Sequence, residues 1–386
     1  MIDDPPRPLV AGRTLERFTR DLTADARAGR LEPVRCRDNE VSRLIDIILR
    51  HGKNNPTLVG PAGVGKTAIV EGFAQRVAAG EVPVALRDVR VLSLDHVGLL
   101  AGTTYRGDYE ERIRSLVAET MAAGDIILFI DELHNLIGQG TGTDAAMDAA
   151  NMLKPSLVRG DFRVIGATTG QEYARWIEND PALERRFQKI VVHELGVPEA
   201  LQILMARKER LERHHNVLIA DDALRAAIAL TDRHVTDRLR PDKAIDAVDE
   251  ACAHMQAVTT YSPATEALIR DRLRLARGAA RPGAPARPAV DGPRDGFAAL
   301  ERIGAELEAI FAGSPSEASR SAGRADARSS RPQPSAAPPV AGHSIASVEA
   351  ELSRRLMDEG VVVRAHDIVR VVGLMSGGVV TWEEDA

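Results

Sequence analysis

The sequence is poor in aromatic residues and cysteines, and it lacks long apolar runs. Aromatic side chains make up 3% of its 386 residues, so Leu, Val, Ile and Ala must build the core. The 2 cysteines, Cys36 and Cys252, show no metal-ligand spacing, which argues against a disulfide framework and favours a reducing compartment. No apolar run reaches the about 20 residues that span a bilayer, and no signal pattern opens the chain. We therefore expect a cytoplasmic protein without a membrane partner.

An excess of positive charge is also lacking. The chain has 50 Lys and Arg against 56 Asp and Glu, which gives a net charge of -6. Motors that act on nucleic acid usually carry a basic footprint, so no nucleic-acid partner is predicted. With 44% apolar and 27% charged residues, the composition is that of a globular protein.

Short apolar runs alternate with helical patterns in the first half of the chain. This alternation predicts an α/β domain over residues 31–195 with a five-stranded parallel sheet. A lead-in over residues 1–30, with a helical pattern at 13–30, precedes it. The predicted strands are at 56–60, 89–94, 126–131, 163–168 and 190–192.

Three helical patterns follow, at 199–213, 221–233 and 241–257. They predict a small helical domain over residues 196–258. Pro241 suits the first turn of the third helix because its missing amide hydrogen has no partner there anyway.

The last third of the chain differs in composition. Residues 259–343 are rich in Pro, Ala, Ser, Gly and Arg, so they predict a linker that buries little apolar surface. Within it, residues 297–311 have one apolar helical face. That helix is a candidate docking element for a protein partner, and packing on its own domain is the alternative. Residues 344–386 hold one more helix and a Val-rich end.

The clearest motif is GPAGVGKT, which fits G-x-x-x-x-G-K-[ST] at every fixed position. A strand-like TLVG precedes it and a helix-forming run follows, as this phosphate loop requires. Its backbone amides close on phosphate oxygens, Lys66 neutralises phosphate charge, and the Thr67 hydroxyl binds Mg²⁺. The residues predicted to bind ATP are Gly60, Pro61, Ala62, Gly63, Val64, Gly65, Lys66 and Thr67.

A pair of acids follows the apolar run IILFI. Ligands of parallel sheets gather at the carboxyl ends of the strands. Asp131 is therefore predicted to complete the Mg²⁺ site with Thr67, and Glu132 to polarise the attacking water. Alone, the pair would better suit a surface loop, but the phosphate loop upstream favours the catalytic role.

The motifs together give a family resemblance. The stretches NNPTLVGPAGVGKTAIVEG, ILFIDELHNLIG, DPALERRFQ and RPDKAIDAVDEA, among others in residues 13–258, resemble the first AAA+ domain of the Clp chaperone family, ClpB and ClpC especially. The resemblance implies an AAA+ P-loop NTPase with a helical lid. It further implies ATP and Mg²⁺ as cofactors, and a homohexameric ring that threads extended protein substrates.

The resemblance also assigns roles that spacing alone does not. Thr169, at the end of the run RVIGATT, matches the family's sensor, and Arg185 and Arg186 match its arginine fingers, which reach the nucleotide of a neighbouring subunit. Without the family match, a solvated strand end and a solvated basic pair would be the simpler interpretations.

Two segments match the loops that line the pore in the family. Tyr105, followed by Arg106 and Gly107, matches the first loop, where an aromatic ring can grip any extended chain. The alternative is a Tyr that packs on its own domain. The Gly-rich stretch at 138–144 matches the second loop.

The sequence departs from the family in several places. Where the family has Val-Ile-Gly-Arg-Asp, this chain has VRCRD, so Arg35 and Cys36 put bulk and charge at the adenine contact unless both side chains point away. Thr104 replaces the family's Lys before the pore Tyr. No Gly-Ala-Arg sensor is present in the helical domain, which leaves Lys243 as a candidate nucleotide contact.

Stretches that resemble the family's N-terminal domain, coiled-coil middle domain and second AAA+ domain are not found. The run DIVRVVGLMSGGVV weakly resembles the segment that joins the two AAA+ domains. The resemblance therefore predicts a single-ring ATP-dependent unfoldase. Two alternatives stay open, a dedicated assembly or regulatory ATPase for one partner complex, and a nucleotide-bound scaffold with little turnover.

Overall fold

The computed structural model describes residues 13–101, 106–137, 155–160, 162–279 and 344–382. They fall into two compact units, one within Met1–Tyr261 and Arg354–Ala386 and the other within Ser262–Ser353. None of the described helices combines the length and the apolar character that crossing a membrane requires.

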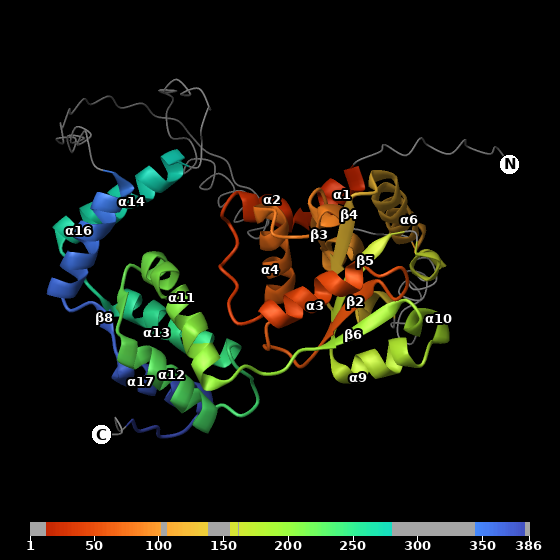
Figure 1. Cartoon of the computed structure of the whole chain (residues 1–386). Coiled ribbons are helices and arrows are strands. Elements are labelled where there is room, and N and C mark those ends of the chain that lie inside the picture. The colour runs from red at the N-terminus through yellow and green to blue at the C-terminus, as the bar shows by residue number, and fades with distance from the viewer. Residues whose placement is uncertain (1–12, 102–105, 138–154, 161, 280–343, 383–386) are drawn as a thin grey trace, which may run out of the picture. The chain divides into compact units, whose positions relative to one another are not determined.

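A six-stranded sheet forms the first part of the larger unit (Figure 1). The strand order is β1-β3-β4-β5-β2-β6, with β1 antiparallel to β3 and all other neighbours parallel. The five predicted parallel strands are thus confirmed. The strands are β1 Thr19–Asp21, β2 Asn55–Val59, β3 Arg90–Leu94, β4 Ile126–Ile130, β5 Arg163–Thr168 and β6 Phe187–Val191.

The lead-in contains the sixth strand, within the residues 13–30 for which the sequence predicted a helical pattern. The structure has two short helices there, α1 (Arg13–Phe18) and α2 (Leu22–Arg27), and β1 lies between them. Asp21 ends the strand and caps α2 by accepting a hydrogen bond from the Ala24 amide at 2.8 Å. Edge pairing with β3 therefore overrides the local helical preference at residues 19–21, whereas the helical pattern holds on both sides of them.

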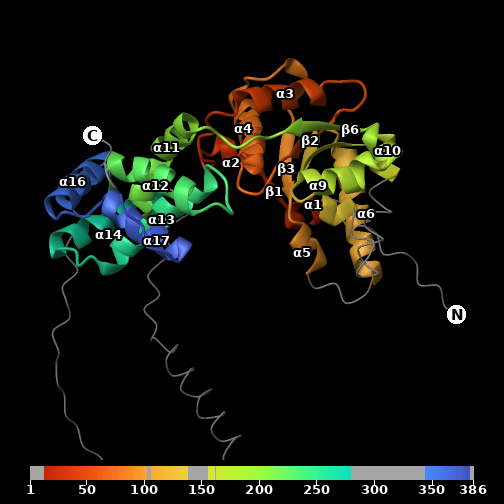
Figure 2. The ribbon, with the colours of Figure 1, turned by 90° about the horizontal axis from the view of Figure 1, so that it is seen from below.

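Alternate residues of the sheet serve two separate cores. Ile127 and Phe129 of β4 belong to one apolar cluster, together with residues of α3 (Asp38–Ile48) and α4 (Lys66–Ala79). Leu128 belongs to the other cluster, with residues of α6 (Arg106–Ala123). Figure 2 shows α3 and α4 on one side of the sheet and α6 on the other. The sheet is buried on both faces, as a parallel sheet with crossover helices requires.

Short helical segments connect the main elements of this region. They are η1 (Val84–Leu86), α5 (His96–Leu100), α7 (His134–Ile137), α9 (Gly170–Tyr173), the π-helical η2 (Ala174–Glu178) and α10 (Pro181–Glu184).

The helical part of the larger unit contains the three predicted helices as α11 (Val197–His215), α12 (Asp221–His234) and α13 (Asp242–Val258). It also contains the C-terminal chain, for which the sequence predicted a joining segment over 344–386. There, β8 (Val362–Val363) pairs in parallel with β7 (Leu218–Ile219).

The last helix, α17 (Ala365–Ser376), packs against α12 and α13 (Figure 1). Its apolar side is fully buried, because Ile368 and Val372 both have 0% exposure. Residues more than a hundred positions apart in the sequence thus share one core, which no local pattern indicates.

The smaller unit contains α14 (Pro263–Ala279) and most of α16 (Ile345–Asp358). The candidate docking helix at 297–311 lies outside the described residues.

We predict that α17 stabilises the helical part of the larger unit. Ile368→Ala should lower the free energy of unfolding by about 2–4 kcal/mol, because it opens a cavity in a closed core. Leu374→Ala on the same helix, where the side chain is 69% exposed, is the matched control and should change it by less than about 0.5 kcal/mol. Urea denaturation measures both, and equal effects would contradict the packing of α17.

Candidate functional site

A cavity of about 390 Å³ opens at the carboxyl ends of β2 and β4. Residues of the phosphate loop, of the acidic pair, of the segment before α3, and of α11 and α13 line it. The predicted site residues among its lining are Ala62, Gly63, Val64, Gly65, Lys66, Thr67, Asp131 and Glu132. Gly60 and Pro61 do not line the cavity, but their carbonyl oxygens accept hydrogen bonds from Lys66.

The phosphate loop has the backbone that its glycines predict. Gly63 and Gly65 have φ values of +78° and +89°, in the left-handed region that other residues avoid. The helix α4 starts directly after Gly65 and has no side-chain cap. Its first amides therefore face the cavity as hydrogen-bond donors at the positive end of the helix dipole, which suits a phosphate group.

Lys66 is buried at 8% exposure, and its ammonium group donates to the carbonyl oxygens of Gly60 and Pro61 at 3.0 and 2.9 Å. These contacts hold a positive charge beside the open amides of the loop. Burying such a charge is costly without partners, so the two carbonyls both stabilise the ammonium group and position it.

The acidic pair lies beside the loop. The Thr67 hydroxyl donates to Asp131 Oδ2 at 3.1 Å, and Asp131 Oδ1 accepts from the Glu132 amide at 3.0 Å. A hydroxyl and a carboxylate in contact offer the oxygen ligands that Mg²⁺ prefers. The donor set thus fits Mg²⁺, with Thr67 and Asp131 as the residues that would hold it.

Glu132 has an unusual backbone. Its φ is +49°, which is uncommon for a residue with a side chain. Hydrogen bonds of the neighbouring residues fix the turn, because the Leu133 amide donates to Ala167 O at 2.9 Å and the Asn135 amide to Glu132 O at 2.8 Å. Strained backbone that is held in this way is typical of functional sites.

Residues that the sequence analysis did not select also line the cavity. Glu32 forms ion pairs with Arg207 at 2.7 Å and Arg210 at 3.5 Å on α11, and Glu32 and Arg207 both line the cavity. Burial raises the pKa of Glu71, a further lining residue. No short motif contains these partners, which lie far apart in the sequence.

Asp242, the first residue of α13, lies directly against the phosphate loop. A Cβ placed on Gly63 would be 3.0 Å from Asp242 Cβ and 3.2 Å from its Oδ2. Burial and repulsion from Asp246 raise the pKa of the Asp242 carboxyl. The helical domain therefore contributes an acidic group where a phosphate-binding site contains mainly donors.

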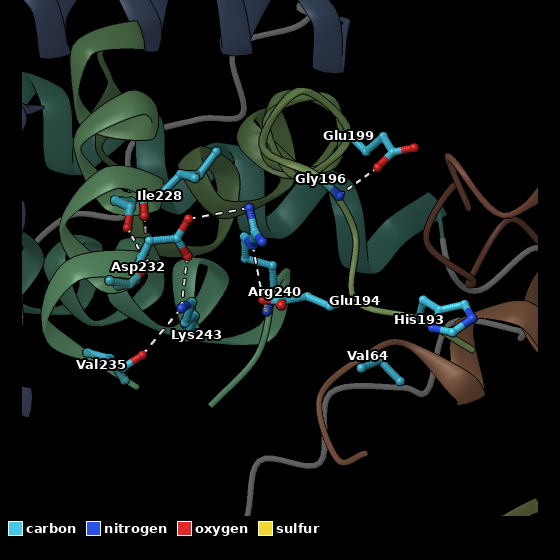
Figure 3. A network of polar contacts seen from close by, with 12 residues as sticks. Val64, His193, Glu194, Gly196, Glu199, Ile228, Asp232, Val235, Arg240 and Lys243 are labelled. Atoms are coloured by element: carbon cyan, nitrogen blue, oxygen red, sulfur yellow. Dashed lines mark hydrogen bonds and ion pairs between the residues drawn. The ribbon is translucent and has the colours of Figure 1, made fainter. Parts of the chain in front are cut away.

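Lys243 does not fulfil the candidate role in nucleotide contact. Figure 3 shows it directed toward Asp232 and Val235, with Nζ 2.8 Å from Asp232 Oδ1 and 3.3 Å from the Val235 carbonyl oxygen. It is buried and does not line the cavity. Its neighbour Asp242 lines the cavity instead.

Asp232 also pairs with Arg240 at 3.3 Å, and Arg240 binds Glu194 through both its amide at 2.9 Å and its Nε at 3.0 Å (Figure 3). The hydrogen bond from Arg240 lowers the pKa of the Glu194 carboxyl. These contacts join the start of α13 to the chain that leaves β6, and so fix the residues on both sides of the cavity.

The segment VRCRD positions the other wall. Arg37 is 4% exposed and donates to the carbonyl oxygens of Val64 at 2.6 Å and His193 at 3.0 Å. Cys36 has a φ of 60°, which explains why the resembled family has glycine there. Its Sγ contacts Gln202 at 3.3 Å and does not line the cavity, whereas Arg35 does. Of these two departures from the family, Arg35 is therefore the one that lines the cavity.

The residues assigned by the family resemblance are not in this cavity. The Thr169 hydroxyl caps α9 by accepting from the Glu172 amide at 3.3 Å. Arg186 donates to the Arg159 carbonyl oxygen at 3.3 Å, while Arg185 is exposed and has no side-chain partner among the described residues. Neither arginine lines the cavity of its own chain.

The predicted pore residues are not in the described part of the chain. Tyr105 and the stretch 138–144 lie outside it, and α6 begins at Arg106, followed by Gly107. Their role in gripping substrate stays a prediction.

Comparisons with known proteins agree with the fold and with the phosphate loop. Residues 56–195 match the ATPase family associated with various cellular activities (AAA), and residues 196–280 match the AAA lid domain. The chaperone protein ClpB of Wolinella succinogenes is 50% identical over 260 residues, which are 67% of this chain and 30% of that protein. ClpB of Mycobacterium tuberculosis H37Rv is 50% identical over 252 residues, covering 65% of this chain and 30% of that protein.

Solved structures with the same fold include the S. cerevisiae Hsp104-ADP complex, with a TM-score of 0.59 and 44% identity over 63% of this chain and 41% of that one. The S. cerevisiae Hsp104:casein complex has a TM-score of 0.58 and 44% identity over 64% of this chain and 42% of that one. The chain thus spans 30% of the length of these two curated relatives.

We predict that Asp242 weakens the binding of anionic nucleotide. Asp242→Asn should tighten ATP binding by about two- to fivefold at low salt, because it removes a negative charge beside the phosphate loop, and less at high salt. Asp246→Asn on the same helix removes the same charge outside the cavity lining, where Arg238 pairs with it at 2.7 Å, and is the matched control. Titration calorimetry measures both, and weaker binding by Asp242→Asn would show that the carboxylate assists binding.

Proposed function

Because residues 56–280 of this chain are an AAA ATPase domain with its lid, we propose that the chain hydrolyses ATP and uses the energy to unfold or remodel other proteins. The observation that carries the ATPase part is the contact of Thr67 with Asp131 and the placement of Glu132 in the same cavity as the phosphate loop. The remodelling part is supported by relatives named chaperone ClpB and by a neighbour solved with casein.

The residues divide the work of hydrolysis among them. Lys66 and the amides at the start of α4 bind the phosphates of ATP, and Thr67 and Asp131 hold Mg²⁺, which supplies charge neutralisation when bound. Glu132 orients the attacking water, and one of its carboxylate oxygens accepts the proton from that water. The surrounding walls orient the nucleotide and reduce the access of bulk water to it.

We further propose that the site is completed between copies of this chain in a homohexameric ring. Arg185 is exposed and unpaired among the described residues, and it lies outside its own cavity. A guanidinium group in that position is available to the nucleotide of a neighbour, where it would stabilise transition-state charge. Arg186 already donates a hydrogen bond to the Arg159 carbonyl oxygen, so we assign the larger part of this charge stabilisation to Arg185.

The first prediction from the proposed function concerns Glu132. Glu132→Gln should reduce ATP hydrolysis by about 100-fold or more, because the amide cannot accept the proton, while ATP binding changes by less than about threefold. Glu209→Gln, an exposed acid on α11 paired with Arg213, is the control and should hydrolyse ATP at the wild-type rate. Phosphate release and nucleotide titration measure the two quantities. Wild-type turnover in Glu132→Gln would contradict the role of Glu132 as the general base.

The same variant separates the proposed remodeller from the alternative of a dedicated ATPase for one partner. In ATP, Glu132→Gln should retain fluorescent casein as a stable complex if the ring threads extended chains in general. Failure to retain casein, with capture of one specific partner complex, would favour the dedicated ATPase. The candidate docking helix at 297–311 would then be the segment to delete, because deleting the whole C-terminal tail, the other candidate docking segment, would also remove α17 from its core.

The second prediction concerns the shared site. Mixed oligomers of Lys66→Ala and Arg185→Ala chains should recover part of the ATPase activity that each variant lacks alone. A Lys66→Ala chain still supplies Arg185 to the intact phosphate loop of its neighbour. Mixing Lys66→Ala with Glu132→Gln is the control, since no pocket in that mixture has both Lys66 and Glu132. Absence of recovery in the first mixture would contradict a site shared between chains.

A further inference from the structure

One side chain that the proposed mechanism does not use lies against the proposed base. His134 begins α7, directly after the turn that contains Glu132. Its Nδ1 is 3.4 Å from Glu132 Oε2 and 3.0 Å from the Thr168 hydroxyl oxygen. A single ring nitrogen therefore contacts both the carboxylate and the end of the neighbouring strand β5.

The Glu132 side chain has little else to hold it. The backbone of the turn is fixed by hydrogen bonds, but the side chain is 44% exposed. Among the described residues, His134 is the cation-forming group within ion-pair distance of this carboxylate. A free carboxylate would sample several rotamers, whereas a base must lie within hydrogen-bond reach of the water that it activates.

The other contact of His134 is rigid. Thr168 is 1% exposed, and it lies in β5, which pairs with the phosphate-loop strand β2 at Thr168 and Val59. The His134 side chain is itself only 20% exposed. The imidazole thus connects the carboxylate end of Glu132 to a part of the sheet whose position is set by the core.

We propose that His134 is a positioning residue for Glu132. With its proton on Nδ1, the imidazole donates a hydrogen bond to the Thr168 oxygen, and the same N–H group lies 3.4 Å from Glu132 Oε2, where its positive end attracts the carboxylate and holds it in the geometry that the attacking water requires. This inference rests on the proposed ATPase function, and it adds a residue that acts through Glu132 without contacting nucleotide. A small loss of such alignment is costly because proton transfer depends steeply on geometry.

The test compares three substitutions of His134. His134→Ala should lower kcat for ATP hydrolysis by about tenfold or more and leave KM for ATP within about twofold, because the contact acts on the chemical step. His134→Asn, which places an amide nitrogen near the position of Nδ1, should recover most of the rate. His134→Gln places its amide farther out, near the position of Nε2, and should not. His51→Ala, an exposed histidine outside the cavity lining, is the control for losing an imidazole.

Thr168→Val tests the anchor independently of any change at His134. It should lower kcat in the same direction, and the double variant with His134→Ala should lose less than the product of the two single losses, because both changes break one chain of contacts. The proposal is overturned if His134→Ala keeps the wild-type kcat, or if Asn and Gln restore the rate equally. Those results would leave the ATPase function intact, whereas wild-type turnover in Glu132→Gln would reject that function itself.

Discussion

The start of α4 is the feature on which the site depends. The helix begins without a capping side chain directly after Gly65, which like Gly63 has a left-handed backbone. Unpaired amides at a helix start carry partial positive charge, and Lys66 adds a full charge beside them while two carbonyl groups hold it in place. An anion satisfies all of these groups at once, so an otherwise unfavourable helix end becomes a phosphate-binding site.

The sheet brings the acidic chemistry to the same place. In the strand order β4-β5-β2, the phosphate loop and the acidic pair follow parallel strands that are separated by one strand, so their carboxyl ends lie at one edge. Asp131 is then close enough to accept a hydrogen bond from the Thr67 hydroxyl. The strand β5, which lies between β4 and β2, supplies Thr168 as the partner of His134. The buried residues of these strands fix the position of this edge of the sheet, and so they also position the side chains that follow the strands.

The helical domain contributes more than a cover for the cavity. Buried Arg37 joins the phosphate loop to the chain that leaves β6, and Arg240 joins that chain to the start of α13 through Glu194. Asp242, the first residue of α13, also lies directly against Gly63 of the phosphate loop. These three contacts link the phosphate loop to the helical domain.

Local patterns in the sequence determined the five parallel strands, the phosphate loop, the acidic pair and the three helices α11, α12 and α13, because each depends on periodicity or on a short motif. Tertiary structure alone decided that residues 19–21 form an edge strand and that α17 belongs to the core of α12 and α13. It also placed Asp242 rather than Lys243 in the cavity, and His134 between Glu132 and Thr168. These features depend on contacts between residues far apart in the chain or on the direction of one side chain on a helix. The spacing of residues in the sequence does not determine long-range contacts or side-chain directions, because both depend on how the helices and strands pack together.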